Sequence, residues 1–351
     1  MKLAFDARAF GRPLDSMDRV LRVLVGAAQH QEWDIELFID DDLRTDSERF
    51  RQWTRPATAA ADSTAVALWS PDTNVLQCNL PVVATLHDIN PLLPDGRGRL
   101  ARYLREYRFR HRVHRCLGRI ARLVTDTDDA RQRVAKVFPD TTGKLSVVPL
   151  FVDPEINALQ GEPRDLILNG LGLIPGFILF VGSLRRHKNW EGLIRAFAAM
   201  PASLRVSHPL VFAGRAERSR REAEHLADTL GVRKDMRVLG VVDERSLCAL
   251  YGGASVLACP SFMEGFGFTP LEAMACGLPV VATNRTCVPE VLGDAPLYVD
   301  PASIESISDA LILVLSDRAK RDSLIDAGLR RAALFNPART GQAMAQVLAM
   351  L

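Results

Sequence analysis

The sequence predicts an α/β protein made of two doubly wound parallel-sheet domains in tandem. Short strand-like apolar runs alternate with longer segments of helical or mixed pattern, which favours parallel sheets covered by helices. This alternation runs through the first half of the chain and starts again at Phe177. The 351 residues exceed one typical domain and fit two, each large enough to bury its own core.

Six strands are expected in each half. In the first half the apolar runs lie at residues 2–6, 34–39, 66–69, 82–86, 120–124 and 145–148. In the second half they begin at Phe177 and continue near residues 210–213, 236–239, 255–258, 279–282 and 297–299. Prolines and glycines are dense between residues 149 and 176, as expected of an interdomain segment. We therefore expect domains at residues 1–160 and 161–337, followed by a last helix at 338–351.

Composition argues against several classes of protein. The six cysteines are scattered without a C-x-x-C pair, which fits buried thiols in a reducing compartment and disfavours a disulfide framework or a zinc site. The N-terminus has no long apolar core, and no run of about 18 apolar residues appears. We therefore expect a cytoplasmic protein without a signal peptide or a membrane-spanning helix.

Residues 264–272 form the most informative segment, because they join two carboxylates, Glu264 and Glu272, to a glycine-rich turn that opens a short helix. A buried strand precedes the turn, and Gly277 suits the end of the helix. The glycines allow backbone N–H groups to approach a ligand closely, and a helix N-terminus favours an anion such as a diphosphate. The segment therefore predicts a grip for a sugar nucleotide.

An alternative explanation of the same segment is a capping box. In that arrangement Thr269 and Glu272 would satisfy orphan donors of the helix. Capping accounts for Glu272 but leaves Glu264 unexplained, together with the run of glycines and phenylalanines that follows it.

The second half resembles the retaining glycosyltransferases of family 4, whose E-x-F-G-x-x-x-x-E signature is similar to residues 264–272. A strand, a glycine turn and a basic cluster at 177–189 resemble the segment that opens the donor-binding domain of that family. Residues 210–214, 238–240, 277–283 and 289–291 fall where the family has its later strands and turns. The resemblance is strong over roughly residues 164–335 and weak before them. It implies the GT-B fold, in which two Rossmann-like domains face a central cleft and a terminal helix crosses back onto the first domain.

The resemblance implies that the second domain binds a nucleoside-diphosphate sugar. Lys188 would offset the negative charge that develops on the departing diphosphate. Glu272 would receive the ribose hydroxyls, and Glu264 would lie near the donor sugar or its phosphate. The donor-binding residues expected in this way are Gly182, Ser183, Arg185, Arg186, His187, Lys188, Gly214, Glu264, Gly265, Phe266, Gly267, Phe268 and Glu272. Many relatives have an arginine where Ser183 stands, so Arg185, Arg186 or His187 is expected to supply the second positive charge.

The first domain would hold the acceptor and one catalytic side chain. His87 ends a buried strand and resembles the cleft histidine of the family, so His87, Lys188 and Glu264 form the expected catalytic set; the alternative is a structural histidine. Asp88 would orient His87 or cap the following turn. Relatives usually have a double glycine where residues 14–19 stand here, so the acceptor-binding mode is expected to differ from theirs. The acceptor-side candidates are Arg12, Arg19, Asp88, Arg112 and Arg115.

A basic run extends from Arg97 to Arg122. It contains ten arginines, two histidines and a single acid, Glu106. On a helix, six of the arginines fall within an arc of roughly 100°. These six are Arg105, Arg108, Arg112, Arg115, Arg119 and Arg122. Such a face suits an anionic membrane surface or a lipid-diphosphate-linked acceptor, and the alternative is a solvated face balanced by acids from elsewhere. Nucleic acid is not expected, because no reading motif is present and the aromatic residues are not interleaved with this face.

No cofactor or metal is expected. Asp126-Thr127-Asp128 resembles the D-x-D of metal-dependent glycosyltransferases, but it precedes a helical segment and fits an N-cap better. A dinucleotide-dependent oxidoreductase would need a G-x-G-x-x-G after a strand and an acidic residue about 20 positions later, and that pattern is missing.

The function expected from the resemblance is retaining transfer of a hexose from a nucleoside diphosphate to a hydroxyl of a glycan or a lipid-linked saccharide in polysaccharide biosynthesis. Short patterns within the donor-binding half of the sequence are most similar to those of mannosyl- and rhamnosyl-transferring relatives. GDP-mannose is therefore the first donor to test. We expect a cytoplasmic enzyme, peripheral at the inner face of the cell membrane. The alternatives are a catalytically silent donor-binding homologue that acts as an assembly partner, and a GT-B nucleotide-sugar epimerase or phosphorylase. Front-face attack and double displacement both remain open.

Overall fold

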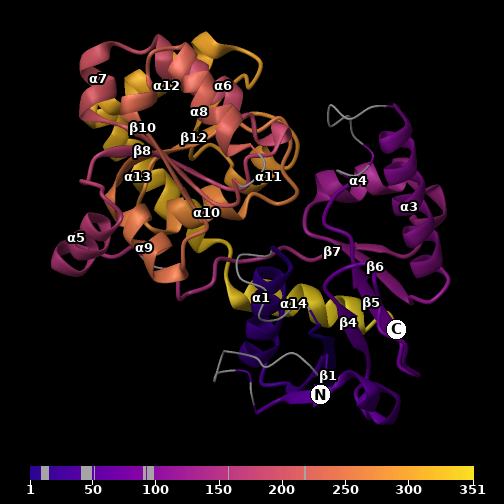
Figure 1. Ribbon diagram of the computed structural model, residues 1–351. Helices are drawn as coiled ribbons and strands as arrows, with labels where there is room; N and C mark the ends of the chain where they lie inside the picture. Colours follow the sequence, from indigo (N-terminus) through magenta and orange to yellow (C-terminus); the bar gives the residue numbers. More distant parts are fainter. Residues whose placement is uncertain are drawn as a thin grey trace. The chain divides into compact units, whose positions relative to one another are not determined.

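The computed structural model describes residues 1–8, 16–40, 50, 52–89, 92, 99–156, 158–216 and 219–351. The chain forms two compact units (Figure 1). The first consists of residues 1–153 together with 335–351, and the second of residues 154–334. The boundaries expected from the sequence lie a few residues further along the chain.

The first unit contains a seven-stranded sheet in which all neighbouring strands are parallel. Its strands are β1 (Lys2–Asp6), β2 (Asp34–Ile39), β3 (Thr54–Pro56), β4 (Leu68–Ser70), β5 (Val82–Thr85), β6 (Arg122–Thr125) and β7 (Leu145–Val147). Their order across the sheet is β3-β2-β1-β4-β5-β6-β7. The six strands predicted here are confirmed, whereas β3 was not predicted. With three partly exposed residues that end in proline, β3 shows no apolar pattern.

Helices flank this sheet along the chain. They are α1 (Ser16–His30), α3 (Arg99–Leu117) and α4 (Asp128–Val137), with short 3₁₀ helices η1 (Ala57–Asp62) and η3 (Pro139–Thr141). The last helix, α14 (Pro337–Leu348), belongs to the first unit, where it packs against α1 (Figure 1). Thr340 Oγ1 donates a hydrogen bond of 2.7 Å to the carbonyl oxygen of Pro149, which fastens α14 to the end of the unit.

The second unit contains a six-stranded sheet, again with parallel neighbours. Its strands are β8 (Phe177–Val181), β9 (Leu210–Ala213), β10 (Met236–Gly240), β11 (Ala254–Cys259), β12 (Val280–Thr283) and β13 (Leu297–Val299), in the order β10-β9-β8-β11-β12-β13. All six lie where the sequence predicted strands. The strands are continuously apolar because both faces of the sheet are covered.

The helices of the second unit lie on both sides of its sheet. They are α5 (Gly161–Gly170), α6 (Trp190–Ala199), α7 (Ala202–Ser207), α8 (Arg220–Thr229), α9 (Glu244–Gly253), α10 (Phe268–Ala275), α11 (Val288–Leu292), α12 (Ile304–Ser316) and α13 (Arg318–Ala333), with 3₁₀ helices η4 (Arg186–Lys188) and η5 (Arg233–Asp235). Figure 1 shows α6, α8 and α12 on one side and α5, α9 and α10 on the other. The core on the first side joins Phe180 and Phe212 of the sheet to Phe197 of α6 and Leu311 of α12.

Both sheets have a topological switch point, where the connections change direction. It lies between β1 and β4 in the first unit and between β8 and β11 in the second. In doubly wound sheets ligands bind outside the carboxyl ends of the strands at this point. The loops after β1, β4, β8 and β11 are therefore the first places to search for a site.

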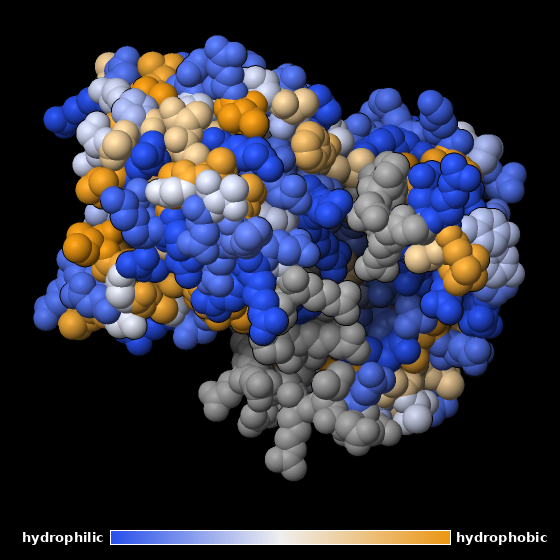
Figure 2. Space-filling view, turned by 45° about the horizontal axis from the view of Figure 1, so that its top comes forward, coloured by the Kyte–Doolittle hydropathy of each residue, from blue (hydrophilic) through white to orange (hydrophobic). Residues whose placement is uncertain are grey.

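No helix in the described part of the chain is long and apolar enough to cross a membrane. Polar and charged residues cover much of the surface seen in Figure 2, with apolar residues scattered among them.

Candidate functional site

The turn after β8 brings two backbone segments into direct contact. Gly182 has φ 148° and Gly214, after the neighbouring strand β9, has φ 129°. A Cβ atom at Gly214 would overlap the carbonyl oxygen of Gly182, so only glycine fits there. The side chain of Lys188 then passes over Gly182, with its Cε within van der Waals distance of the position a Cβ would occupy. Lys188 is thereby held at the carboxyl end of β8.

Lys188 forms an ion pair with Glu264 from the loop after β11. Its Nζ lies 2.8 Å from Oε1 and 2.6 Å from Oε2 of the carboxylate, although 76 residues separate the two positions. Ser261 Oγ donates a further hydrogen bond of 2.6 Å to Oε1. The side chain of Glu264 is 8% exposed and that of Lys188 is 22% exposed. The pair therefore lies at the switch point of the second sheet, nearly buried but open on the lysine side.

Both members of this pair are charged at neutral pH. Burial by itself would raise the pKa of Glu264, but the charge of Lys188 and its hydrogen bonds hold that pKa below the usual value. Burial likewise opposes the charge of Lys188, and Glu264 more than offsets it, so the pKa of Lys188 is raised. A positive and a negative group therefore lie side by side where little water reaches them.

The loop that carries Glu264 is held by residues in unusual backbone conformations. Thr286 has φ 58°, and its Oγ1 accepts a hydrogen bond of 3.3 Å from the backbone N–H of Glu264. Cys287 Sγ donates to the backbone oxygen of Glu264 at 3.3 Å. Asn189, with φ 56°, donates from Nδ2 to the carbonyl oxygens of Pro260 (3.1 Å) and Pro301 (2.7 Å). Left-handed backbone in a β-branched residue such as threonine is strained, and such strain clusters at functional sites.

The capping-box alternative for residues 264–272 is wrong. The N-cap of α10 is Gly267, with φ 94°, and not Thr269, which lies inside the first turn of the helix. Glu272 instead lies in the second turn, 2% exposed, where its Oε2 accepts a hydrogen bond of 2.7 Å from Tyr251. Gly277, with φ 71°, follows the helix in a Schellman arrangement in which Leu278 N–H donates to the carbonyl oxygen of Ala273. Glu272 is therefore a buried carboxylate held by a side chain, and helix capping does not explain it.

The two phenylalanines of the loop shape its interior. Phe266 is buried, and its ring meets that of Phe268 edge to face, with centroids 5.0 Å apart. Gly265 lies between Glu264 and Phe266, in the stretch that leads to α10.

The basic cluster after β8 contains groups of different character. Burial, and then the charge of Lys188, lowers the pKa of His187 to about 4, so His187 is neutral at pH 7. Arg186 is exposed and lies 3.9 Å from Glu191. Arg185 is also exposed, and no described carboxylate forms an ion pair with it. Ser183 is half-buried beside them. Of the three residues considered for the second positive charge, His187 does not qualify.

His87 in the first unit is bound through both ring nitrogens. Nδ1 lies 2.5 Å from Asp126 Oδ2, and Nε2 lies 2.7 Å from the carbonyl oxygen of Pro71. Burial disfavours the charged ring, but the charge and hydrogen bond of Asp126 raise the pKa of His87 to about 9. His87 is therefore an imidazolium at neutral pH that donates from both nitrogens. Asp126 makes the Nδ1 contact, whereas Asp88 contributes through its charge.

The sequence alone did not identify Asp126 as this partner. The prediction of an N-cap at residues 126–128 is confirmed, since Thr127 Oγ1 accepts from the backbone N–H of Ala130 at 3.1 Å. Asp126 stands one residue earlier, directly after β6, and His87 follows the neighbouring strand β5. The signal that could have identified this contact is that both residues directly follow strands and that consecutive strands are often neighbours in a sheet.

Polar groups also meet at the switch point of the first sheet. Arg8 Nε and Nη2 lie 2.8 and 2.7 Å from the carboxylate oxygens of Asp6, and Nη2 also donates to the carbonyl oxygen of Asn74 at 2.7 Å. The loop after β4 is thus held by Arg8 at Asn74 and by His87 at Pro71. Neither Asp6 nor Arg8 was predicted as a site residue.

The acceptor-side candidates do not form one group. Arg12 lies outside the described residues, and Arg19 lies half-buried on α1. Arg112 and Arg115 are exposed on α3. The predicted six-arginine helical face is too long, because α3 ends at Leu117 and Arg122 begins β6. The guanidinium of Arg122 donates to the carbonyl oxygens of Gly143 and Met350, both at 3.2 Å.

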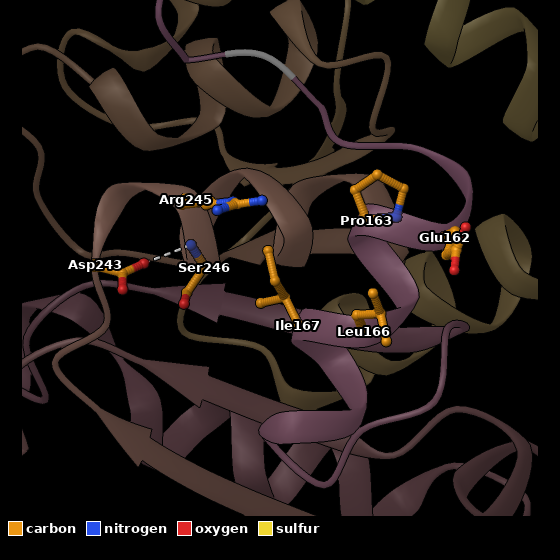
Figure 3. A pocket seen from close by; sticks show the side chains of 7 residues that line it. All are labelled: Glu162, Pro163, Leu166, Ile167, Asp243, Arg245 and Ser246. Carbon is orange, nitrogen blue, oxygen red and sulfur yellow. Dashed lines mark hydrogen bonds between the residues drawn. The ribbon is translucent and has the colours of Figure 1, made fainter.

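A separate pocket lies between α5 and α9 (Figure 3). Glu162 and Leu166 line it from α5, and Asp243 and Ser246 from the start of α9. Asp243 caps α9 by accepting a hydrogen bond of 2.7 Å from Ser246 N–H. None of the expected donor-binding residues lines this pocket. Within the described ranges, no group of three or more histidine, cysteine, aspartate or glutamate side chains could hold a metal ion.

Comparison with known proteins finds one family model that matches most of the second unit. Residues 171–331 match the family model described as Glycosyl transferases group 1. The O-antigen chain mannosyltransferase B of Escherichia coli is 30% identical over 226 residues, which are 64% of this chain and 59% of that protein. The serotype-specific mannosyltransferase WbdA of Escherichia coli is 28% identical over 271 residues, 75% of this chain and 33% of that protein. The chain therefore matches little more than half of the first relative and a third of the second.

Solved structures share the fold over nearly the whole chain. Sucrose-phosphate synthase from Thermosynechococcus elongatus has a TM-score of 0.76 at 19% identity, covering 99% of this chain and 98% of that one. WaaG, a glycosyltransferase involved in lipopolysaccharide biosynthesis, has a TM-score of 0.74 at 19% identity, covering 99% of both chains. HepE from Anabaena, in complex with UDP and glucose, has a TM-score of 0.73 at 16% identity, covering 100% of both chains. At these identities the comparisons show the fold, and they confirm the predicted GT-B architecture.

Proposed function

We propose that this chain is a group 1 glycosyltransferase, because residues 171–331 match the model of that family, and that it transfers a hexose from a nucleoside diphosphate to a hydroxyl of a glycan or a lipid-linked saccharide. The observation that carries the proposal is the Lys188–Glu264 pair at the switch point of the second sheet. Both groups stay charged there, next to the glycine contact between Gly182 and Gly214. An anionic donor is the ligand that such a partly open ammonium group favours.

In this proposal Lys188 acts on the leaving group. An ammonium group has three N–H donors in a compact head, so it can keep a contact with Glu264 and offer another to a phosphate oxygen. Its low exposure strengthens that interaction relative to water. Arg185 is the second cation in the proposal, because His187 is neutral and Arg186 faces Glu191. Charge on the departing diphosphate is then offset by side chains, without a metal.

Glu264 acts in this proposal by holding the site, and it does not attack the sugar. Its Oε1 accepts from Lys188 and Ser261, and its Oε2 accepts from Lys188. A carboxylate with a lowered pKa and committed oxygens is a weak nucleophile. We therefore favour retention through front-face attack, in which the leaving phosphate takes the proton of the acceptor. Glu272, buried against Tyr251 near the start of α10, receives the ribose.

GDP-mannose is the donor that we propose first. The support is the activity of two similar proteins, which are mannosyltransferases, together with the sequence pattern shared with mannosyl-transferring relatives. We place the acceptor in the first unit, where the exposed arginines of α3 would attract an anionic group of the acceptor or the anionic surface that presents it. Polysaccharide assembly at the inner face of the cell membrane is the setting that this combination favours.

The competing function is that of a catalytically silent homologue, which binds the donor without turnover and acts as an assembly partner. It is favoured by His87, whose two nitrogens are already bound within the first unit and so are not free to act on a donor or acceptor.

A panel of nucleotide sugars separates these functions. Each donor is incubated with the wild-type protein, with Lys188→Ala and with the control Arg186→Ala, while thermal stabilisation and release of nucleoside diphosphate are followed. We expect GDP-mannose to stabilise the wild type and to release GDP slowly, and Lys188→Ala to lower the rate by roughly 10²- to 10³-fold. Stabilisation without release, even with lipid-linked acceptors added, would support the binding protein. An absence of stabilisation by every donor would refute the proposed function.

A further inference from the structure

A pocket in the first unit lies between α3 and the loop after β4. It encloses about 320 Å³, which is within the range of small-molecule sites. Arg108, Arg112, Arg115 and Arg119 line it, together with the rings of Tyr107 and His111. Residues 73–75 close the opposite side. The arginines that the sequence grouped as a helical face therefore border a cavity.

The pocket is strongly positive. None of the ion pairs formed within the described ranges involves Arg108, Arg112, Arg115 or Arg119, and no described carboxylate lines the pocket. Glu106, the acid of α3, is bound by Arg102 at 2.8 Å and belongs to a different part of the helix surface. Asp72 lies close by, where its Oδ1 accepts from the backbone N–H of Asn74. Several guanidinium groups around one cavity repel each other unless an anion joins them, and their planar forks match phosphate oxygens.

The pocket also offers an aromatic surface. The rings of Tyr107 and His111 are stacked, with centroids 6.1 Å apart and an interplanar angle of 12°. Tyr107 is 56% exposed. An exposed flat ring beside cationic groups provides an apolar face and a charged edge in one site. A sugar ring that carries a phosphate has the complementary pair of surfaces.

The position of the pocket links it to the switch point of the first sheet. The loop that closes it begins directly after β4 and is held by Arg8 at Asn74 and by His87 at Pro71. A ligand in the pocket would therefore rest on the same loop that fixes the imidazolium of His87.

We propose that this pocket binds the phosphate or diphosphate group of the acceptor, with the attached sugar on Tyr107. The inference rests on the proposed function, because it names the acceptor class of that transferase. A membrane headgroup carries the same phosphoryl chemistry, but it would contact the exposed face of α3 as a whole. The acceptor would contact only the residues that line the pocket.

The test compares two pairs of arginines with the same change in charge. Arg112→Gln/Arg115→Gln removes two groups that line the pocket, and Arg102→Gln/Arg110→Gln removes two from α3 that do not. Binding of pyrophosphate and of a sugar joined through diphosphate to a short, water-soluble alkyl chain is measured by calorimetry on the full chain. We expect the pocket pair to lose at least about tenfold in affinity and the control pair to change less than twofold. Equal losses of affinity in both pairs, or no loss in either, would refute phosphate binding in this pocket.

Tyr107→Ala separates the ring from the charges. It should weaken binding of the alkyl diphosphate sugar several-fold and leave pyrophosphate binding unchanged, and equal effects on both would contradict the sugar contact. Vesicles containing phosphatidylglycerol provide the second arm. Binding to vesicles that falls alike in both arginine pairs, while the soluble sugar diphosphate fails to bind, would assign these arginines to the membrane and overturn the proposal.

Donor binding keeps the two hypotheses apart. Thermal stabilisation by GDP-mannose is measured in the same variants and should equal that of the wild type, because the pocket lies in the first unit and Lys188 in the second. Normal donor stabilisation without diphosphate-sugar binding would refute the pocket alone. Binding in the pocket without stabilisation by any nucleotide sugar would refute the transferase alone.

Discussion

Replacing Lys188 by methionine should leave Glu264 buried without its counter-charge. The side chain of Glu264 is 8% exposed, and Lys188 contacts both oxygens of its carboxylate. Removing one partner of a buried ion pair typically costs about 3–5 kcal/mol. For a unit of this size that cost corresponds to a fall in Tm of roughly 6–20 °C at pH 7. Thermal unfolding of Lys188→Met, followed by circular dichroism, measures it.

The pH dependence of this variant should also change sign. In the wild type the pKa of Glu264 is lowered, so the pair contributes stability above the unfolded pKa and loses it as the pH falls through the folded value. Without Lys188, burial would raise the pKa of Glu264 above its unfolded value. The variant should then gain stability as the pH falls from 7 towards 5, while the wild type should not.

A double variant completes the test. Lys188→Met/Glu264→Gln removes both charges and should recover most of the stability lost by Lys188→Met, because an uncompensated charge is no longer buried. If Lys188→Met melts within about 1 °C of the wild type and shows the same pH profile, the two groups are not buried against each other, and the reasoning from this pair fails.

Three further changes test other parts of the structure. Gly214→Ala places a Cβ against the carbonyl oxygen of Gly182 in backbone that favours glycine, and it should destabilise the second unit by roughly 1–3 kcal/mol in urea unfolding. Gly170→Ala, with open space around it, is the control. Similar losses of stability in both variants would contradict the close contact. Thr286→Ala removes the acceptor for the backbone N–H of Glu264 and should lower kcat about tenfold with a small change in Tm, whereas Thr286→Ser keeps the hydroxyl and should restore kcat. A serine variant as slow as the alanine variant would argue against positioning of Glu264 by this hydroxyl. His87, with a raised pKa of about 9, should contribute stability that is complete below pH 6.5 and is lost as the pH rises through 9. Asp126→Asn should flatten this loss of stability with rising pH. An unchanged pH profile of stability in Asp126→Asn would disprove the coupling between His87 and Asp126.

The fold was predictable because the parallel strands are buried on both faces. Continuous apolar runs such as residues 177–181 and 210–213 appear in the sequence as strands without any tertiary information. Strand β3 was not predictable in this way, since its three residues are too few and too polar to form a pattern. The end of α3 was also placed wrongly, because arginines continue at helical spacing beyond Leu117, where the chain has already turned towards β6.

The site was predictable where a motif carries the chemistry. Lys188, Glu264 and Glu272 were expected from the residues and from the resemblance, and they lie at or beside the carboxyl end of the second sheet. Their roles in catalysis remain predictions. Thr286 and Asn189 were not expected as supports of this loop, because their role depends on hydrogen bonds to residues that are distant in the sequence.

The sequence by itself determined two tandem parallel-sheet domains and the loops that carry their charged groups. Local patterns suffice for this, because apolar periodicity and glycine turns act over a few residues. Only the tertiary structure decided which of these groups meet. Asp126 pairs with His87 because β5 and β6 are neighbours, and Lys188 pairs with Glu264 because β8 and β11 are neighbours at a switch point. Strand order arises from packing between segments far apart in the chain, and the pKa of each group follows from that packing.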